Sequence, residues 1–390
     1  MQDFEFFSPT HFVFGRNAEQ KAGTMLAERG ASKVLVHFGG NSARANGTLD
    51  SVEESLKEAG VDFIELGGVR PNPEIGLVRE AVDLCKKEGV DWVLAVGGGS
   101  VIDSAKAVAL GVRYGGDVWD FFGTGKDPES VLPIAAVLTI PAAGSEGSPN
   151  TVISNDELGR KTGYGRPMLR PQLAFMNPEL TFTLPPYQSA AGMVDMFAHL
   201  LERFFDDLGA VPVTDNLCLS LMKTIRAEAP RVMAEPDNYD ARANIMWAGM
   251  LCHNGVAGVG RHTDWATHGL EHELSALNPQ ITHGAGLAVM FPAWMEYVYP
   301  ENPARLIQYG AEVFGLTPTG DTDADVYNAI DETRSFFASL GMPTSLEELG
   351  VFEDDIESMI PTLLENKGEP FGSFMKLSMD DAREIYRLAL

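Results

Sequence analysis

The chain has 390 residues, is 45% hydrophobic and 22% charged, and carries a formal net charge of −26. This length exceeds one ordinary hydrophobic core, so we expect two domains, and the composition excludes a disordered chain. The acidic balance excludes the basic surface with which proteins bind nucleic acid or an anionic membrane.

The N-terminal segment, MQDFEFFSPTHFVFG, lacks the basic and apolar regions of a signal peptide, and no apolar run is long enough to span a membrane. The cysteines are Cys85, Cys218 and Cys252. They are widely spaced and form no CxxC pair, which is typical of free thiols in a reducing compartment. We therefore expect a cytoplasmic protein.

Residues 1–185 alternate short β-rich segments with amphipathic helical patterns. Strands are predicted at 33–38, 62–66, 91–96 and 133–140, and helices at 49–60, 74–89 and 101–112. This alternation predicts a Rossmann-like α/β domain, a parallel sheet wrapped by helices. After the breaker-rich LTFTLPP the pattern changes to long helical segments rich in Ala, Met and Leu, so residues 186–390 are predicted to form an all-helical domain.

Glycine-rich turns follow two of the predicted strands and lead into helices. Their backbone N–H groups and the helix N-terminus favour a pyrophosphate, as in dinucleotide-binding domains. Neither turn matches G-x-G-x-x-G or a P-loop, so a tight turn without a ligand remains an alternative. Candidate dinucleotide contacts in these turns are Gly39, Gly40, Asn41, Gly97, Gly98, Gly99 and Ser100.

The residues after the first of these strands also bear on the choice of dinucleotide. The segment GGNSARANG contains no Asp or Glu to bind a ribose 2′-hydroxyl, but it contains Arg44. An arginine can pair with a 2′-phosphate, so the segment favours NADP(H) over NAD(H).

Histidines gather in the second half of the chain. Six of the eight are His199, His253, His262, His268, His272 and His283. Asp195 and His199 are four residues apart in one helical pattern, and His268 and His272 repeat that spacing in another, so each pair projects from one helix face. A carboxylate with imidazoles is a ligand set for Zn²⁺ or Fe²⁺. The pattern alone does not exclude His253 or His262 as ligands, and each residue taken singly also fits an ordinary core or surface role.

Several segments, in order along the chain, resemble the iron-dependent (group III) alcohol dehydrogenase family, and within it the NAD(P)H-dependent butanol dehydrogenase branch. They are FFSPTHFVFG, GGVRPNP, AVGGGSVIDSAKAVA, TIPAAGSE, NPELTFTLPPYQSAAGMVDMFAH, DWATHGLEHELSA and THGAGLAVMFPAW. The resemblance implies an α/β dinucleotide-binding domain followed by an all-helical metal-binding domain, and a homodimer.

The resemblance also implies roles for individual residues. Metal ligands fall on Asp195, His199, His268 and His283, and His272 lies beside the metal as the candidate to pass a proton. Besides the glycine turns, the implied cofactor contacts are Asn72, Asp103, Thr139, Ser145 and Lys161. Ala142-Ala143 stand where many relatives carry threonines, which puts some hydroxyl contacts to the cofactor in doubt.

The activity implied is reversible hydride transfer between NAD(P)(H) and a small primary alcohol or aldehyde such as butanol or butanal. Of the few basic residues between 187 and 290, only Arg261 is near the histidine motifs in sequence, which favours a neutral substrate. This disfavours a dehydroquinate synthase, whose substrate is anionic. The alternatives are a glycerol or other polyol dehydrogenase and, from another class, a non-catalytic nucleotide- or metal-binding protein.

Overall fold

The computed structural model describes residues 1–390, Gly123 by its secondary structure alone, and divides the chain into two compact units. The α/β unit is Phe7–Leu184 with Pro236–Asn254, and the helical unit is Met1–Phe6, Pro185–Glu235 and Gly255–Leu390. The expected single division at residue 185 differs from this in two places, at the N-terminal six residues and at helix α9 (Tyr239–His253).

Aromatic contacts explain why α9 belongs to the α/β unit. Phe12 and Phe14 of strand β1 (His11–Phe14) each meet the Trp247 ring edge-on, with ring centroids 5.8 Å apart. The guanidinium of Arg16 lies 4.1 Å from the centre of the Tyr239 ring. These contacts join residues more than 200 positions apart in sequence, so no local pattern could have assigned this helix.

The α/β unit is built on a six-stranded parallel sheet with the strand order β1-β8-β5-β4-β2-β3. The other strands are β2 (Lys33–Phe38), β3 (Asp62–Leu66), β4 (Trp92–Gly98), β5 (Ile134–Ile140) and β8 (Leu173–Met176). The central strands are apolar at nearly every position, as expected of strands covered on both faces. An antiparallel hairpin of β6 (Asn150–Asn155) and β7 (Arg160–Gly165) stands apart from this sheet.

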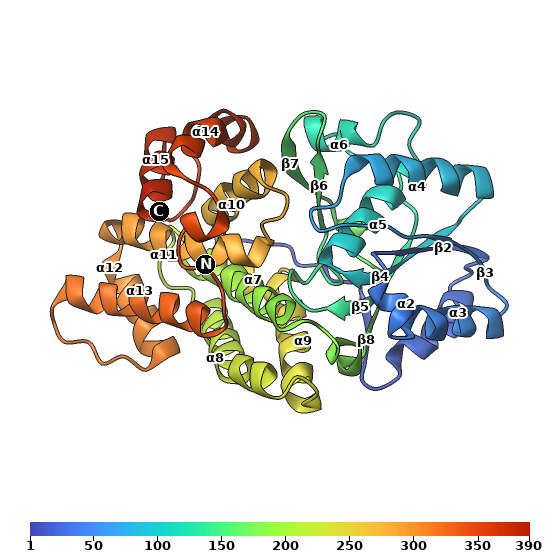
Figure 1. Ribbon diagram of the computed structural model, residues 1–390, viewed down its shortest axis with the longest axis horizontal. Helices are drawn as coiled ribbons and strands as arrows, with labels where there is room; N and C mark the ends of the chain where they lie inside the picture. The colour runs from blue at the N-terminus through green and yellow to red at the C-terminus, as the bar shows by residue number, and fades with distance from the viewer. The chain divides into compact units, whose positions relative to one another are not determined.

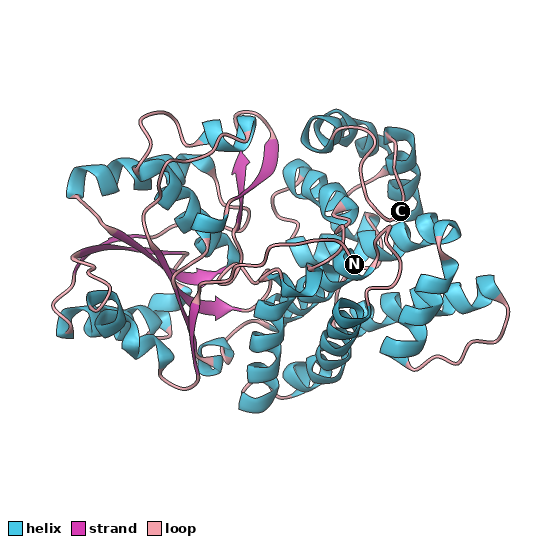
Figure 2. Cartoon of the chain, turned by 180° about the vertical axis from the view of Figure 1, so that it is seen from behind, coloured by secondary structure: helices cyan, strands magenta, loops and turns pink.

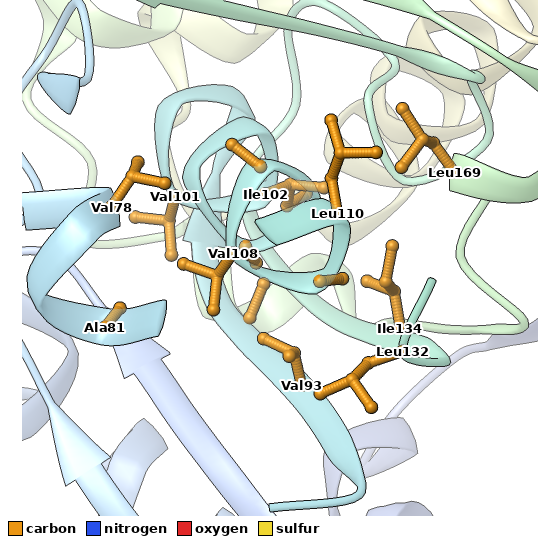
Figure 3. Close-up of a cluster of buried hydrophobic side chains, with 14 of the residues drawn as sticks. Val78, Ala81, Val93, Val101, Ile102, Val108, Leu110, Leu132, Ile134 and Leu169 are labelled. Atoms are coloured by element: carbon orange, nitrogen blue, oxygen red, sulfur yellow. The ribbon is translucent and has the colours of Figure 1, made fainter. Parts of the chain in front are cut away.

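Helices cover both faces of the sheet (Figure 1). They are α1 (Ala22–Ala27), α2 (Ser42–Ala45), α3 (Thr48–Glu58), α4 (Ile75–Glu88), α5 (Gly99–Val112) and α6 (Trp119–Thr124). Alternate residues of β4 point to opposite faces: Val93 packs with α4 and α5, as Figure 3 shows, and Leu94 packs with α1 and α3. The predicted Rossmann-like α/β fold is confirmed.

The helical unit is helical almost throughout (Figure 2). Its helices are α7 (Pro186–Phe204), α8 (Pro212–Ala234), α10 (Ala266–Leu277), α11 (His283–Val298), α12 (Pro303–Tyr309), α13 (Thr322–Ser339), α14 (Glu353–Lys367) and α15 (Met379–Leu388). None of the helices described is long and apolar enough to cross a membrane.

Helix α7 forms the centre of the helical unit. It starts at a Pro-Pro pair, which suits the first helical turn, and it is buried continuously from Ser189 to Phe204. A helix buried on all sides should be apolar on all sides, yet α7 buries Asp195, His199, Glu202 and Arg203. Because burying such groups is costly without partners, these residues make α7 the candidate position of a functional site.

Candidate functional site

The first pair of candidate ligands lies on adjacent turns of α7. Asp195 and His199 are both buried, and Nδ1 of His199 lies 2.8 Å from the backbone oxygen of Asp195 and 3.0 Å from its Oδ1. Because a carbonyl oxygen only accepts, Nδ1 carries the proton. Nε2 of His199 is then the nitrogen that can coordinate a metal.

His268, on α10, is directed at Asp195 in the same way. Its Nδ1 lies 2.9 Å from Oε1 of the fully buried Glu202, and its Nε2 lies 4.0 Å from Oδ1 of Asp195. A ligating histidine commonly donates its second ring N–H to a carboxylate, which fixes its tautomer and raises its basicity. Glu202 therefore fixes the ring of His268 so that its Nε2 is on the side of Asp195.

His283, the first residue of α11, repeats the arrangement with a different glutamate. Its Nδ1 bonds the carboxylate of fully buried Glu271, and its Nε2 lies 3.9 Å from Oδ1 of Asp195. Ligand atoms around one tetrahedral Zn²⁺ are separated by roughly 3.3 Å. The two Nε2–Oδ1 distances, 4.0 and 3.9 Å, exceed that separation by about 0.6–0.7 Å. Donor atoms within 4.8 Å of one another come from Asp195, His199 and His268 and, as a second group, from Glu271, His272 and His283. The donors therefore fit a divalent ion by their chemistry.

The remaining histidines occupy other places. His272 lies beside His283, with ring centroids 5.5 Å apart, and is half-buried. His262 is exposed and pairs with Asp207. His253 belongs to the α/β unit, where its ring contacts the side chain of Asn150.

A half-buried lysine lies beside Glu202, the carboxylate that contacts the candidate ligand His268. Lys367, at the end of α14, donates from Nζ to the backbone oxygen of Trp265, at 3.0 Å, and faces Glu202 and Asp264 electrostatically. Burial lowers the pKa of Lys367. Burial, and secondly Asp264, raise the pKa of Glu202 to about 8, against the hydrogen bonds that Glu202 accepts. A cation bound nearby would oppose this rise in the pKa of Glu202, because a positive charge favours the ionised carboxylate.

Sequence reasoning missed Glu202, Glu271 and Lys367. A signal existed for the two glutamates, because each interrupts an apolar helical pattern beside a candidate histidine: Glu202 stands three residues after His199, and Glu271 between the pair in HGLEH. No comparable signal points to Lys367, which comes from a helix almost 100 residues later in the chain.

In the α/β unit, the GGGS turn joins β4 to α5. Packing alone accounts for two of its glycines: an added Cβ would lie 2.5 Å from Cγ2 of Val101 at Gly97, and 2.8 Å from Cβ of Ile140 at Gly98. At Gly99 the nearest atom, Cβ of Ala143, is 3.5 Å away, an ordinary contact. The third glycine and Ser100 are therefore the positions of this turn that the local fold leaves open to a ligand.

The turn after β2 is more open. An added Cβ at Gly40 would meet nothing within 4 Å, and Asn41 is exposed. Gly39 accepts a backbone hydrogen bond from Gly68, which brings this turn beside the segment containing Asn72. Asn72 has a φ of 55°, a left-handed conformation that asparagine tolerates.

Arg44 does not stand alone beside this turn. Its guanidinium pairs with Glu65 of β3, with Glu53 of α3 at 3.2 Å and with Asp50 at 3.5 Å. The segment GGNSARANG itself contains no carboxylate, but carboxylates of the neighbouring strand β3 and helix α3 pair with its arginine. Local sequence could not reveal this, because the pairing depends on how β2, β3 and α3 lie together.

The other cofactor candidates are spread over the α/β unit: Asp103 lies on α5, Thr139 in β5, Ser145 after β5 and Lys161 in β7. Oδ1 of Asp103 accepts the Ser145 hydroxyl, at 2.5 Å, and Oδ2 accepts the Val152 N–H, at 2.9 Å. Thr139, Ser145 and Lys161 are all buried. The Asp103 carboxylate thus holds the segment after β5, which carries Ser145.

Comparisons with known proteins identify the family of the chain. The model of the family "Iron-containing alcohol dehydrogenase" matches residues 9–178, and that of "Fe-containing alcohol dehydrogenase family, C-terminal" matches residues 189–390. The chain is 39% identical to NADH-dependent butanol dehydrogenase A of Clostridium acetobutylicum, over 99% of both chains. It is 36% identical to the NADPH-dependent aldehyde reductase YqhD of Escherichia coli, over the full length of both.

Solved structures give the same result. The crystal structure of NADH-dependent butanol dehydrogenase A from Thermotoga maritima superposes with a TM-score of 0.97 at 40% identity, covering 100% of this chain and 99% of that one. Both halves of the chain match the family in order, and the resemblance seen in the sequence is confirmed. The chain belongs to the iron-containing alcohol dehydrogenase family, whose members are oxidoreductases acting on CH–OH groups.

Proposed function

We propose that the protein transfers a hydride reversibly between a nicotinamide dinucleotide and a small primary alcohol or aldehyde such as butanol or butanal. Relatives named as butanol dehydrogenases and an aldehyde reductase, each at 36–39% identity over nearly the whole chain, support this reaction. The observation that carries it is the convergence of His268 and His283 on the Asp195 carboxylate, each with its Nδ1 held by a buried glutamate.

Asp195, His199, His268 and His283 are the proposed ligands of a divalent ion, Fe²⁺ or Zn²⁺. When bound, such an ion supplies a Lewis acid that lowers the pKa of an alcohol or polarises an aldehyde carbonyl. The three Nδ1 contacts orient the ligand nitrogens. His272, beside His283 and outside this set, is proposed to pass the proton at a ring nitrogen.

The α/β unit is proposed to bind the dinucleotide, with the pyrophosphate at the N-terminus of α5, where Gly99 and Ser100 lie. We propose NADP(H) over NAD(H), because residues 39–47 hold no carboxylate and the Arg44 side chain is 45% exposed. The pairing of Arg44 with Glu53 and Glu65 limits the preference for NADP(H) that this arginine can give. Since an exposed ion pair contributes about 0–1 kcal/mol, we expect KM values that favour NADPH by about fivefold or less. A clear preference for NADH would contradict this proposal.

The ion pairs of Arg261 with internal carboxylates support a neutral substrate. Its side chain is fully buried and pairs with Asp206, at 3.3 Å, and Asp215, at 2.5 Å. The basic residue nearest the histidine motifs in sequence is thus committed to internal carboxylates. A substrate bearing phosphate or several carboxylates would need another cation.

The test compares butanal, glycerol and lactaldehyde as substrates, in the direction each requires, with both dinucleotides and with protein whose Fe and Zn contents are measured. We expect the highest kcat/KM with butanal and activity that follows metal content. A higher kcat/KM for glycerol would favour a polyol dehydrogenase. Bound metal without turnover of any substrate would favour a non-catalytic binding protein.

Two further proposals concern assembly and location. β1 is an edge strand, and Phe7 and Phe14 are 61% and 41% exposed, which suits pairing with a second copy. We expect a homodimer by light scattering, and a monomer at working concentrations would contradict it. The three cysteines are free and buried, which suits the cytoplasm.

A further inference from the structure

Lys106, on α5, is a fully buried cation that hydride transfer does not explain. Its Nζ donates to Oγ of Ser145 and to the backbone oxygen of Asn150, both at 2.7 Å, and to the backbone oxygen of Ser148, at 3.0 Å. A buried ammonium is costly unless its three N–H groups find acceptors. All three of these acceptors lie in one short segment, residues 145–150, between β5 and β6.

The same segment is held by Asp103, one turn earlier on α5. Oδ1 of Asp103 accepts the hydroxyl hydrogen of Ser145, while Oγ of Ser145 accepts from Lys106. The backbone oxygen of Asp103 accepts the Thr151 hydroxyl, at 2.8 Å. Helix α5 thus contacts residues 145–151 through both a cation, Lys106, and an anion, Asp103. The hydroxyl hydrogen of Ser145 is donated to Asp103.

The charges around Lys106 are balanced inside the fold. Asp103 and the buried Glu146 face it with negative charge, and Arg170 faces it with positive charge while donating to the backbone oxygen of Gly147. On the side of α9, His253 contacts Asn150. Burial lowers the pKa of Lys106 to about 8, and burial raises the pKa of Glu146 to about 7. The charged groups of this cluster hold residues 145–150 in place through hydrogen bonds from Lys106 and Arg170.

We propose that Lys106 is a positioning residue for dinucleotide binding, holding residues 145–150 against the helix whose first turn contains Gly99 and Ser100. The inference rests on the proposed function, in which the N-terminus of α5 and Ser145 contact the dinucleotide. Without Lys106, two backbone oxygens and the Ser145 hydroxyl lose a charged donor, and Asp103 loses the positive charge of Lys106. The segment then leaves its place and dinucleotide affinity falls.

The test is Lys106→Met, which keeps the length of the side chain and removes its donors. On metal-loaded protein, the Kd of NADPH and of NADH is measured by fluorescence titration, with steady-state kinetics and metal content alongside. We expect the dinucleotide Kd and KM to rise by about tenfold or more, since hydrogen bonds to a charged group are lost. The metal content and the KM of the alcohol should stay unchanged, a split that general unfolding would not produce.

Lys33→Met is the matched control, because Lys33 lies in the same unit but pairs with Glu88 near the surface. It should leave the dinucleotide Kd unchanged. If Lys106→Met is not recovered folded, Lys106→Gln, which keeps an amide donor, should give an intermediate Kd. A folded Lys106 variant with the wild-type Kd overturns the inference. Failure of the wild-type protein to bind either dinucleotide would instead overturn the proposed function.

Discussion

Glu202→Gln changes the hydrogen-bond partner of His268 and leaves all four proposed metal ligands in place. Oε1 of Glu202 accepts both the backbone N–H and the Nδ1–H of His268, each at 2.9 Å, and Oε2 accepts the backbone N–H of Trp265, at 2.7 Å. An amide has one accepting oxygen where the carboxylate has two. Either Trp265 or His268 therefore faces an NH₂ group after the substitution.

Both orientations of the amide carry a cost. If the NH₂ faces Trp265, one partly buried N–H at the start of α10 loses its acceptor, at about 1–3 kcal/mol. If it faces His268, the ring must accept at Nδ1 and protonate Nε2, the nitrogen proposed to bind the metal. We expect the metal Kd to rise by about 10- to 100-fold, the usual cost of losing such a partner.

The assay titrates metal-free protein with Zn²⁺ or Co²⁺ against a chromophoric chelator, with thermal melts recorded with and without metal. Glu273→Gln is the matched control: Glu273 is also buried on α10, but its Oε1 accepts from Asn366 rather than from a histidine ring. The control should keep the wild-type Kd. A folded Glu202→Gln protein with the wild-type metal Kd would refute the reasoning.

Three further expectations test other parts of the molecule. His272→Ala should retain metal and lose about 10²–10⁴-fold in kcat, whereas His268→Ala should lose metal; metal-free His272→Ala protein would make His272 a ligand instead. Gly97→Ala should destabilise the fold by about 1–3 kcal/mol in denaturant melts, because its Cβ would overlap Val101, while Gly40→Ala should be neutral; equal effects would contradict this. Burial lowers the pKa of His37 from 6.5 to about 4, so the unfolded chain takes up the proton first as pH falls. The stability due to neutral His37 is present above pH 6.5 and is lost between pH 6.5 and 4, by about 3 kcal/mol in total; His37→Gln should lack this component, and an unchanged pH profile would count against it.

Local patterns carried much of the structure and part of the site. The segments 33–38, 62–66, 91–96 and 133–140 predicted β2–β5 to within two residues. The central strands β4 and β5 are apolar at nearly every position because they are covered on both faces. The edge strand β3 is instead exposed at Asp62 and Glu65. Helical spacing likewise paired Asp195 with His199, since side chains four residues apart share a face. The ligand chemistry is equally local, because it depends only on which side chains are present.

Tertiary structure decided everything that needs a partner distant in the chain. Trp247 assigns α9 to the α/β unit through β1, and Glu65 reaches Arg44 from the adjacent strand. Only the packed fold shows that a side chain at Gly97 would overlap Val101, whereas one at Gly99 would make only an ordinary contact. The sequence by itself determined which groups could bind a metal and a dinucleotide. Which nitrogen of each histidine is presented was decided by buried partners such as Glu202, because a tautomer depends on its hydrogen-bond partner and periodicity carries no information about partners beyond one helix turn.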